Sequence, residues 1–273
     1  MHYGPATMAA DEQRWALILG ASSGFGEATA RALAKRGMNV CGVHLDRRAG
    51  MAHVDEITAA IRETGRQALY LNVNAADHDK RRQVLDALAG RIAEDGGGVV
   101  RVLMHSLAFG SLTPFVGAEP ARLATPAQIE MTLNVMAHSL VYWVQDAVGR
   151  GLLARGSRVV AMTSAGSTTV WPGYGPVSAA KAALEAHVRQ LAVELAPSGV
   201  TVNAIRAGVT DTPAFRKIPG SELMAEHVRT RNPSGRMTET TDVAKVIAML
   251  TSDDAQWITG TVIGVDGGED VST

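Results

Sequence analysis

An apolar run that leads directly into a glycine loop and then into a helix most limits how this chain can fold. Residues 15–19 read WALIL, residues 20–26 read GASSGFG, and the alanine-rich segment 27–37 ends in a glycine. This order forms an anion site, because backbone N–H groups and the positive end of the helix dipole face one point. The stretch therefore predicts a dinucleotide pyrophosphate at the end of the first strand.

The glycine spacing predicts how closely such a ligand approaches. We expect Gly20 to permit the tight turn, and Gly24 and Gly26 to let backbone approach phosphate and helix approach strand. The spacing is G-x-x-x-G-x-G, which differs from the common G-x-G-x-x-G fingerprint. The loop residues expected at the cofactor are Gly20, Ser22, Ser23, Gly24, Phe25 and Gly26.

The rest of the chain alternates strand and helix patterns. Seven apolar runs are separated by segments with helical spacing, which predicts an α/β fold with a doubly wound, seven-stranded parallel sheet of the Rossmann-like kind. The 273 residues suffice for one large core, and we find no linker or internal repeat. We expect residues 14–273 to form a single domain and residues 1–13 a loose N-terminal extension.

Composition argues against several other classes of protein. A net charge of -1, with 19% charged residues and no basic stripe, argues against nucleic-acid binding. No window approaches 18 uninterrupted apolar residues, so no membrane span is expected. The one cysteine, Cys41, lies in an apolar run, and the first residues do not resemble a signal peptide. We therefore expect a cytoplasmic protein.

The residues after the second predicted strand give conflicting signals about the cofactor. An acid there favours the free 2′-hydroxyl of NAD(H), whereas arginine favours the 2′-phosphate of NADP(H). Asp46 and Arg47 are both present, after His44 and Leu45, and position 48 is a second arginine. We expect His44, Leu45 and Arg47 at the cofactor and favour NADP(H), with NAD(H) as the alternative. An ordinary solvated loop would carry the same charges.

Further strand ends are predicted to contribute to the same cofactor site. Open α/β sheets bind ligands at the carboxyl ends of their strands, and small residues let backbone pass close to a ligand. We place Asn72 and Val73 beside the adenine, and Thr212 beside the pyrophosphate or the nicotinamide amide. The expected contacts of this kind are Asn72, Val73, Ser106, Leu107, Gly208, Val209 and Thr212.

The stretch 164–181, SAGSTTVWPGYGPVSAAK, carries the candidate reactive groups. Tyr174 and Lys181 are seven residues apart, so on a helix they lie within about 20° of one face. We expect the lysine cation to lower the pKa of the phenol and make it a better proton donor. Ser164 is a weaker candidate for a substrate or water contact. Taken alone, the pair is also typical of an amphipathic helix start followed by a solvated lysine.

Other polar residues are interpreted more simply. Asn134 lies in a predicted helix over 126–150, where its amide would support a water chain behind the lysine or be a satisfied core amide. His138 and His187 lack a partner at metal-ligand spacing, so no metal site is predicted. Residues 213–236 are expected to form a mobile lid over an apolar substrate, or a plain surface excursion.

Together these motifs resemble the short-chain dehydrogenase/reductase family over residues 15–268. The matches are the GASSGFG loop, Asn134, Ser164, Lys181, NAIRAG after the sixth strand, and the terminal VDGG. The resemblance implies the family fold and a nicotinamide cofactor. One departure is informative: most members carry tyrosine four residues before the lysine, where this chain has Val177, and Tyr174 stands three residues earlier.

The Tyr-x6-Lys spacing and HSLAF at 105–109 are similar to those of enoyl-acyl carrier protein reductases. The standard glycine loop and Ser164 resemble the NADPH-dependent branch that stays closer to the wider family. The resemblance implies reduction of a trans-2-enoyl thioester of acyl carrier protein or coenzyme A, in fatty acid synthesis. Tyr174 would bind the thioester oxygen, and Lys181 the nicotinamide ribose.

The same resemblance implies a homotetramer with helices near 126–150 and 177–197 at an interface. Two alternatives to enoyl reduction remain open at this point. One is a short-chain carbonyl or 3-ketoacyl reductase, and the other is a nucleotide-binding protein that has lost turnover, as the valine at 177 would suggest.

Overall fold

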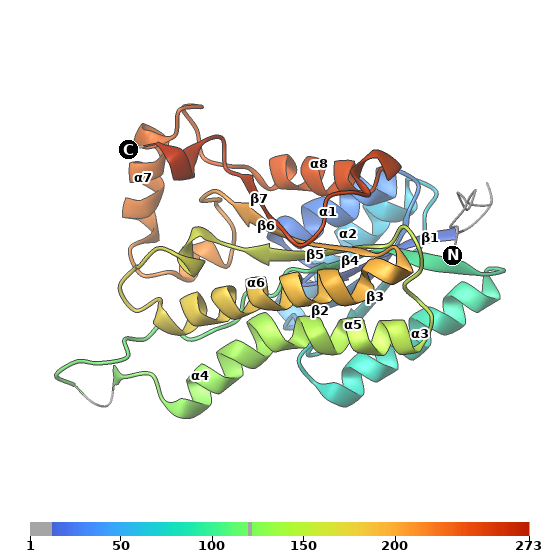
Figure 1. Ribbon diagram of the computed structural model, residues 1–273, viewed down its shortest axis with the longest axis horizontal. Coiled ribbons are helices and arrows are strands. Elements are labelled where there is room, and N and C mark those ends of the chain that lie inside the picture. Colours follow the sequence, from blue (N-terminus) through green and yellow to red (C-terminus); the bar gives the residue numbers. More distant parts are fainter. Residues whose placement is uncertain (1–12, 120–121, 273) are drawn as a thin grey trace.

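The computed structural model describes residues 13–119 and 122–272, so residues 1–12 of the expected extension lie outside the described part of the chain. Gln13, which we had assigned to that extension, is the first residue of a strand. Seven strands form one sheet in the order β3-β2-β1-β4-β5-β6-β7 (Figure 1). All neighbouring strands are parallel, which confirms the predicted fold. The strands are β1 (Gln13–Leu19), β2 (Asn39–His44), β3 (Ala68–Asn72), β4 (Gly98–His105), β5 (Arg158–Thr163), β6 (Thr201–Ala207) and β7 (Val262–Val265).

Helices cover both faces of the sheet (Figure 1). Buried side chains of α1, α2 and α8 pack on one face, and those of α3, α5 and α6 pack on the other. The helices are α1 (Gly24–Lys35), α2 (Met51–Arg62), α3 (His78–Glu94), α4 (Pro126–Leu133), α5 (Ser139–Gly149), α6 (Gly175–Leu195), α7 (Ser221–Arg231) and α8 (Thr240–Leu250).

Strand β1 shows why this sequence needs two layers of helices. Residues 15–19 are all fully buried, and their side chains alternate between the two faces. Trp15, Leu17 and Leu19 join one apolar cluster, whereas Ala16 and Ile18 join the other. Burying each large apolar side chain contributes about 1.5–3 kcal/mol, so a strand that is apolar at every position is stable only when covered on both sides.

The helix predicted over 126–150 contains a feature that its periodicity did not reveal. A π-helical turn, Asn134–His138, joins α4 to α5, and the helical path ends at Gly149. Such turns are rare and occur often at functional sites. The apolar spacing on either side stays helical, so the sequence pattern gave no sign of the extra residue.

The carboxyl ends of the strands meet at one end of the molecule, where α7 and the segment after β4 also lie (Figure 1). In an open parallel sheet this is the edge at which ligands bind. Within the described residues, no helix is both long enough and apolar enough to cross a lipid bilayer.

Candidate active site

The glycine loop is packed so closely against neighbouring backbone that side chains are excluded. Gly20 has a φ of +88°, and a Cβ there would collide with the carbonyl oxygen of Ser106 and meet the side chain of Leu107. A Cβ at Gly26 would collide with the carbonyl oxygen of Gly20. The structure therefore brings Ser106 and Leu107, from the end of β4, to the loop after β1.

The first turn of α1 keeps its backbone donors available. Ser23 is the N-cap residue of α1, but its side chain accepts no hydrogen bond from that helix, whereas Asp77 and Thr125 cap α3 and α4. The N–H groups at a helix start need an acceptor, and a pyrophosphate oxygen supplies one. Thr212 is buried, and its Cγ2 lies 3.4 Å from the Cβ position of Gly24. Thr212 thus reaches the glycine loop from the segment after β6.

These residues fit the pyrophosphate of a dinucleotide. The Thr212 hydroxyl accepts a hydrogen bond from the Phe215 N–H at 3.2 Å, so its own proton remains to be donated to an anion. Ser22 is half-buried in the loop, and Phe25 packs on the apolar cluster beneath α1. The site would hold phosphate through backbone N–H groups, with Thr212 as the nearby hydroxyl.

The residues predicted at the adenosine end also meet. His44 and Asn72 are the last residues of β2 and β3 and are paired in register, and the Val73 N–H donates to the His44 carbonyl at 2.8 Å. The Asn72 side chain bonds both the N–H and the carbonyl of Asp46, at 3.0 and 2.9 Å. Leu45 projects into solvent with 71% exposure. Residues from two strands therefore form one edge.

Tyr174 immediately precedes α6 and lies over Gly166 together with Ser164. A Cβ at Gly166 would stand 2.5 Å from Cε1 of the phenol ring and 3.2 Å from the Ser164 Oγ. Burial raises the pKa of Tyr174, and its interaction with Ser164 opposes that rise. The expectation that Lys181 lowers this pKa is wrong, because desolvation outweighs the effects of nearby groups. Tyr174 is a protonated phenol near neutral pH.

Ser164 offers a hydroxyl that the rest of the described chain does not use. Its Oγ is buried and lacks a hydrogen bond to any described residue, and its approach to Tyr174 does not reach hydrogen-bond geometry. A buried hydroxyl without a partner carries a free-energy cost, which a bound polar group would relieve.

Lys181 is buried in the second turn of α6. Its Nζ donates to the Met162 carbonyl at 2.6 Å, and burial lowers its pKa to about 8. Glu185, one turn farther along, opposes that shift and accepts a hydrogen bond from the Thr163 hydroxyl at 2.6 Å. An ammonium has three N–H groups, so two remain for the hydroxyls of a ligand.

The π-helical turn that contains Asn134 packs against α6. Asn134 is half-buried, and its side-chain amide forms no hydrogen bond within the described ranges. It is therefore not the satisfied core amide that was one of our two interpretations. Its unpaired amide remains able to hold a water molecule, as the other interpretation requires.

His105 is a buried residue that the sequence analysis did not single out. Its Nε2 bonds the Ser139 hydroxyl at 2.8 Å, and that hydroxyl donates to the Val135 carbonyl at 2.8 Å. Because the single hydroxyl proton is used there, Nε2 carries the imidazole proton. Burial and the charge of Lys181 lower the pKa of His105 to about 3, so the ring is neutral and links β4 to the π-helical turn.

The position at which most short-chain enzymes carry tyrosine is a core position here. Val177 is 5% exposed, belongs to the cluster beneath α6, and stands 3.1 Å from the Cβ position of Gly110. A phenol at 177 would have to displace this packing. Tyr174 is therefore the tyrosine available beside Ser164.

The backbone N–H groups of Gly208 and Val209, which we expect near the cofactor, have acceptors within the chain. The Gly208 N–H donates to the Val265 carbonyl at 3.1 Å, and the Val209 N–H donates to the Glu269 carboxylate at 3.1 Å. Both N–H groups are thus already used within the chain. Periodicity could not reveal this, because the acceptors lie about 60 residues away in sequence.

Aromatic residues flank Tyr174, and the sequence analysis missed them because Gly- and Pro-rich loops have no periodicity. The ring of Phe115 packs against Gly175, and the Trp171 indole N–H donates to the Pro219 carbonyl at 3.3 Å. The second contact joins the loop before Tyr174 to the predicted lid. Other exposed apolar residues of these loops and of α7 are Phe109, Val116, Val170 and Leu223.

The side chains of His138 and His187 contact each other. Their rings approach at 2.9 Å between Nδ1 and Nε2, and burial together with His138 lowers the pKa of His187. The two residues are 49 apart in sequence, so spacing along one helix could not predict the contact. In the part of the chain that is described, no cluster of three or more His, Cys, Asp or Glu side chains could hold a metal ion.

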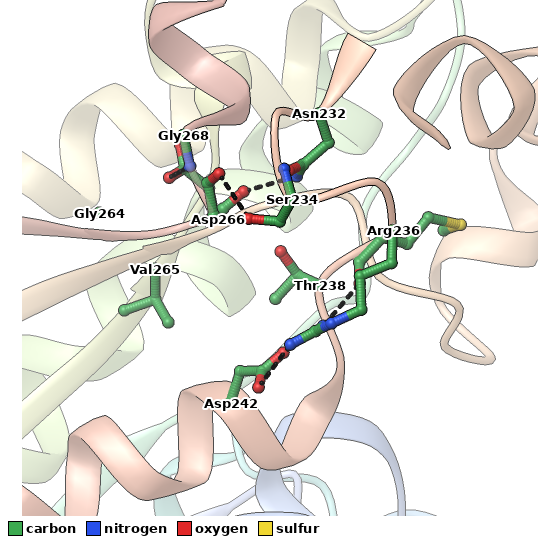
Figure 2. A pocket seen from close by; sticks show the side chains of 11 residues that line it. Asn232, Ser234, Arg236, Thr238, Asp242, Gly264, Val265, Asp266 and Gly268 are labelled. Carbon is green, nitrogen blue, oxygen red and sulfur yellow. Dashed lines mark hydrogen bonds and ion pairs between the residues drawn. The ribbon is translucent and has the colours of Figure 1, made fainter. Parts of the chain in front are cut away.

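A pocket of about 440 Å³ lies beside the end of β7, and Tyr174 is not among its lining residues. Figure 2 shows the side chains that line it. Its polar groups bond one another: Arg236 pairs with Asp242 at 2.7 Å, and the Asn232 side chain donates to the Asp266 carbonyl at 2.8 Å. These contacts fasten the segment after α7 to α8 and to the residue that follows β7. We therefore assign the pocket to the base of the predicted lid.

Comparison with known proteins agrees with this geometry. A family model described as enoyl-(acyl carrier protein) reductase matches residues 20–269. The chain belongs to the short-chain dehydrogenase/reductase family. This short-chain enzyme is therefore an NAD(P)-dependent oxidoreductase with the family's single-sheet fold.

Individual relatives have different substrates in their names. The chain is 30% identical to cis-4-hydroxycyclohexanecarboxylate dehydrogenase of Sinomonas cyclohexanicum, over 94% of this chain and 96% of that protein. It is also 30% identical to 1-cyclohexenylcarbonyl-CoA reductase of Streptomyces collinus, over 95% and 88%. A solved structure of enoyl-[acyl-carrier-protein] reductase (NADH) from Aquifex aeolicus VF5 is similar, with a TM-score of 0.79, 25% identity, and coverage of 95% and 97%. Family membership thus establishes the redox class and leaves the reacting bond open.

Proposed function

We propose that this short-chain enzyme uses NADPH to reduce the carbon–carbon double bond of a trans-2-enoyl thioester. The position of the tyrosine carries the proposal. Tyr174 immediately precedes α6, whereas position 177, the usual place of the family's tyrosine, is a valine packed in the core. In an enoyl thioester, the oxygen that gains negative charge lies two carbons beyond the hydride acceptor. In a ketone it is attached to that carbon. A phenol displaced away from Lys181 therefore suits the enoyl substrate.

Each residue of the site has a proposed task. When bound, NADPH supplies the hydride that is added to C3 of the substrate. Tyr174, whose pKa burial raises, donates a hydrogen bond to the thioester oxygen and stabilises the enolate. Lys181 holds the nicotinamide ribose with its two spare N–H groups. Ser164 contacts substrate or water, and Asn134 holds a water molecule behind the lysine.

The substrate carrier and the assembly are parts of the same proposal. The proposed substrate is an acyl thioester of acyl carrier protein or coenzyme A, of the kind found in fatty acid synthesis. The exposed apolar side chains of Phe115 and Trp171 beside Tyr174 support an acyl substrate. We also propose a homotetramer with α4, α5 and α6 at an interface. Exposed apolar side chains on α5 and α6 support this arrangement: Tyr142, Val148 and Val193.

One observation favours a second function, reduction of a carbonyl or 3-ketoacyl group. The Ser164 hydroxyl is buried, has no hydrogen bond to a described residue, and lies beside Tyr174. Two hydroxyls converging on one point would also hold a ketone oxygen. The relative from Sinomonas cyclohexanicum is named a dehydrogenase.

A paired assay separates the two functions. We expect NADPH to be consumed with crotonyl-CoA and not with acetoacetyl-CoA, and to be used in preference to NADH. Consumption with acetoacetyl-CoA alone would establish the carbonyl reductase instead.

Substitution of Tyr174 tests its proposed role. Tyr174→Phe is expected to lower kcat by about 100-fold while the Kd for NADPH stays unchanged, because only the phenolic proton is removed. Tyr70→Phe, which removes a hydroxyl that has no hydrogen-bond partner among the described residues, is the matched control. Full activity of Tyr174→Phe would exclude the phenol from the reaction.

A further inference from the structure

The segment after β2 contains both an acid and two arginines, and the structure treats them differently. Asp46 is bound by its neighbours. The side chains of Arg47 and Arg48 are exposed and form no hydrogen bond or ion pair with any residue in the described ranges. The structure thus distinguishes the acid from the two arginines.

The Asp46 carboxylate is bound to a buried imidazole. Nδ1 of His44 lies 2.9 Å from Oδ2 of Asp46, and the exposed fractions of the two side chains are 1% and 28%. A carboxylate has no proton to donate, so the imidazole N–H donates to it. The other oxygen, Oδ1, is 3.0 Å from the Cβ position of Gly50, at the turn that leads into α2.

The backbone of Asp46 is held as firmly as its side chain. Asn72, at the end of β3, accepts a hydrogen bond from the Asp46 N–H and donates one to its carbonyl. The carbonyl of His44 accepts a further bond from Val73. The carboxylate cannot turn outward without leaving the buried imidazole N–H unsatisfied, which is costly.

We propose that the His44–Asp46 pair sets the cofactor preference by withdrawing the carboxylate from the adenosine ribose. An acid that selects NAD(H) must offer its oxygens to the ribose hydroxyls, and it repels a 2′-phosphate. With Asp46 held by His44, that repulsion is weakened, and Arg47 and Arg48 remain free to bind the phosphate. The inference deepens the NADPH part of the proposed function and rests on the family's use of NAD(P).

Cofactor titrations without substrate test this inference separately from the reaction. Binding of NADPH and NADH is followed by cofactor fluorescence, and the ratio of Kd for NADH to Kd for NADPH is compared between variants. His44→Leu is expected to lower the ratio by about tenfold, because the released carboxylate binds the NADH ribose and repels the phosphate. The double variant His44→Leu/Asp46→Asn is expected to restore it. Asp46→Asn alone should change it by less than about threefold.

Further variants keep the test decisive if His44→Leu folds poorly. Asn72→Ala releases the Asp46 backbone and should also lower the ratio of the two Kd values. Any contact of Asn72 with the adenine is common to both cofactors, so its loss cancels in that ratio. Arg47→Gln is expected to weaken NADPH binding by about tenfold and to leave NADH binding unchanged. Arg66→Gln removes an exposed arginine between α2 and β3, so it should leave the ratio unchanged.

Two results would overturn the inference. One is an unchanged ratio in both His44→Leu and Asn72→Ala. The other is a rise in the ratio with Asp46→Asn alone of tenfold or more, which would mean that the carboxylate already faces the cofactor. Neither result depends on whether crotonyl-CoA is reduced, so a failure here differs from a failure of enoyl reduction.

Discussion

The charge of Lys181 should impose a falling limb on the pH profile. Burial lowers its pKa to about 8 from a model-compound value of 10.5. The ammonium is then about 90% charged at pH 7 and about 10% charged at pH 9. If the charge holds the cofactor ribose and favours the enolate, turnover at saturating NADPH should fall about tenfold across this interval.

Substitution of Glu185 should move the falling limb in a predictable direction. Its carboxylate opposes the effect of burial on the Lys181 pKa, so Glu185→Gln should move the falling limb to lower pH, by roughly half a unit to one unit. Initial rates with crotonyl-CoA between pH 6 and 9.5 measure the shift. Glu194→Gln removes an acid from the exposed end of the same helix and should leave the limb in place. A limb at the same pH in all three proteins would refute the assignment to Lys181.

The same pKa has a consequence for stability. Between about pH 8 and 10.5, the unfolded chain keeps a proton on Lys181 that the folded chain has lost. The contribution of this group to the free energy of unfolding therefore rises with pH, by up to about 3 kcal/mol. Urea denaturation of the unmodified protein and of Lys181→Met at pH 7.5 and 9.5 isolates that contribution. A difference between the two proteins that does not change with pH would contradict the buried ammonium.

Three further predictions follow from contacts elsewhere in the fold. Gly26→Ala should weaken NADPH binding at least about tenfold in a fluorescence titration, because the methyl group collides with the Gly20 carbonyl. Gly90→Ala, on α3 with open space around it, should leave NADPH binding unchanged. Arg158→Met should lower the free energy of unfolding by about 3 kcal/mol in urea, since its guanidinium donates to the carbonyls of Leu250, Ser252 and Gly156; exposed Arg82→Met should change it by less than about 0.5 kcal/mol. Trp171→Phe removes the indole N–H that donates to the Pro219 carbonyl and should raise KM for crotonyl-CoA about threefold with kcat unchanged. Trp257→Phe, at an exposed position, should alter neither constant. Equal KM values in the two variants would show that the Trp171 contact does not position the lid.

Patterns among residues that are neighbours in sequence were sufficient to predict the architecture. The fully apolar run at 15–19 required cover on both faces, and the glycine loop before a helix indicated an anion site. The replacement of tyrosine by Val177 and its reappearance at 174 were also visible in the sequence alone. Each of these signals lies within a few turns of chain, where spacing and residue type are sufficient.

Contacts between distant segments were decided only by the tertiary structure. The sequence contained Asp46 beside Arg47 and gave conflicting signals, because the turn after β2 is held by Asn72 at the end of β3, 26 residues away. It also predicted the wrong direction for the Tyr174 pKa, since the depth of burial is set by loops that pack over the phenol. Local spacing fixes which groups share a face; desolvation and hydrogen-bond partners depend on which segments, far apart along the chain, close over that face.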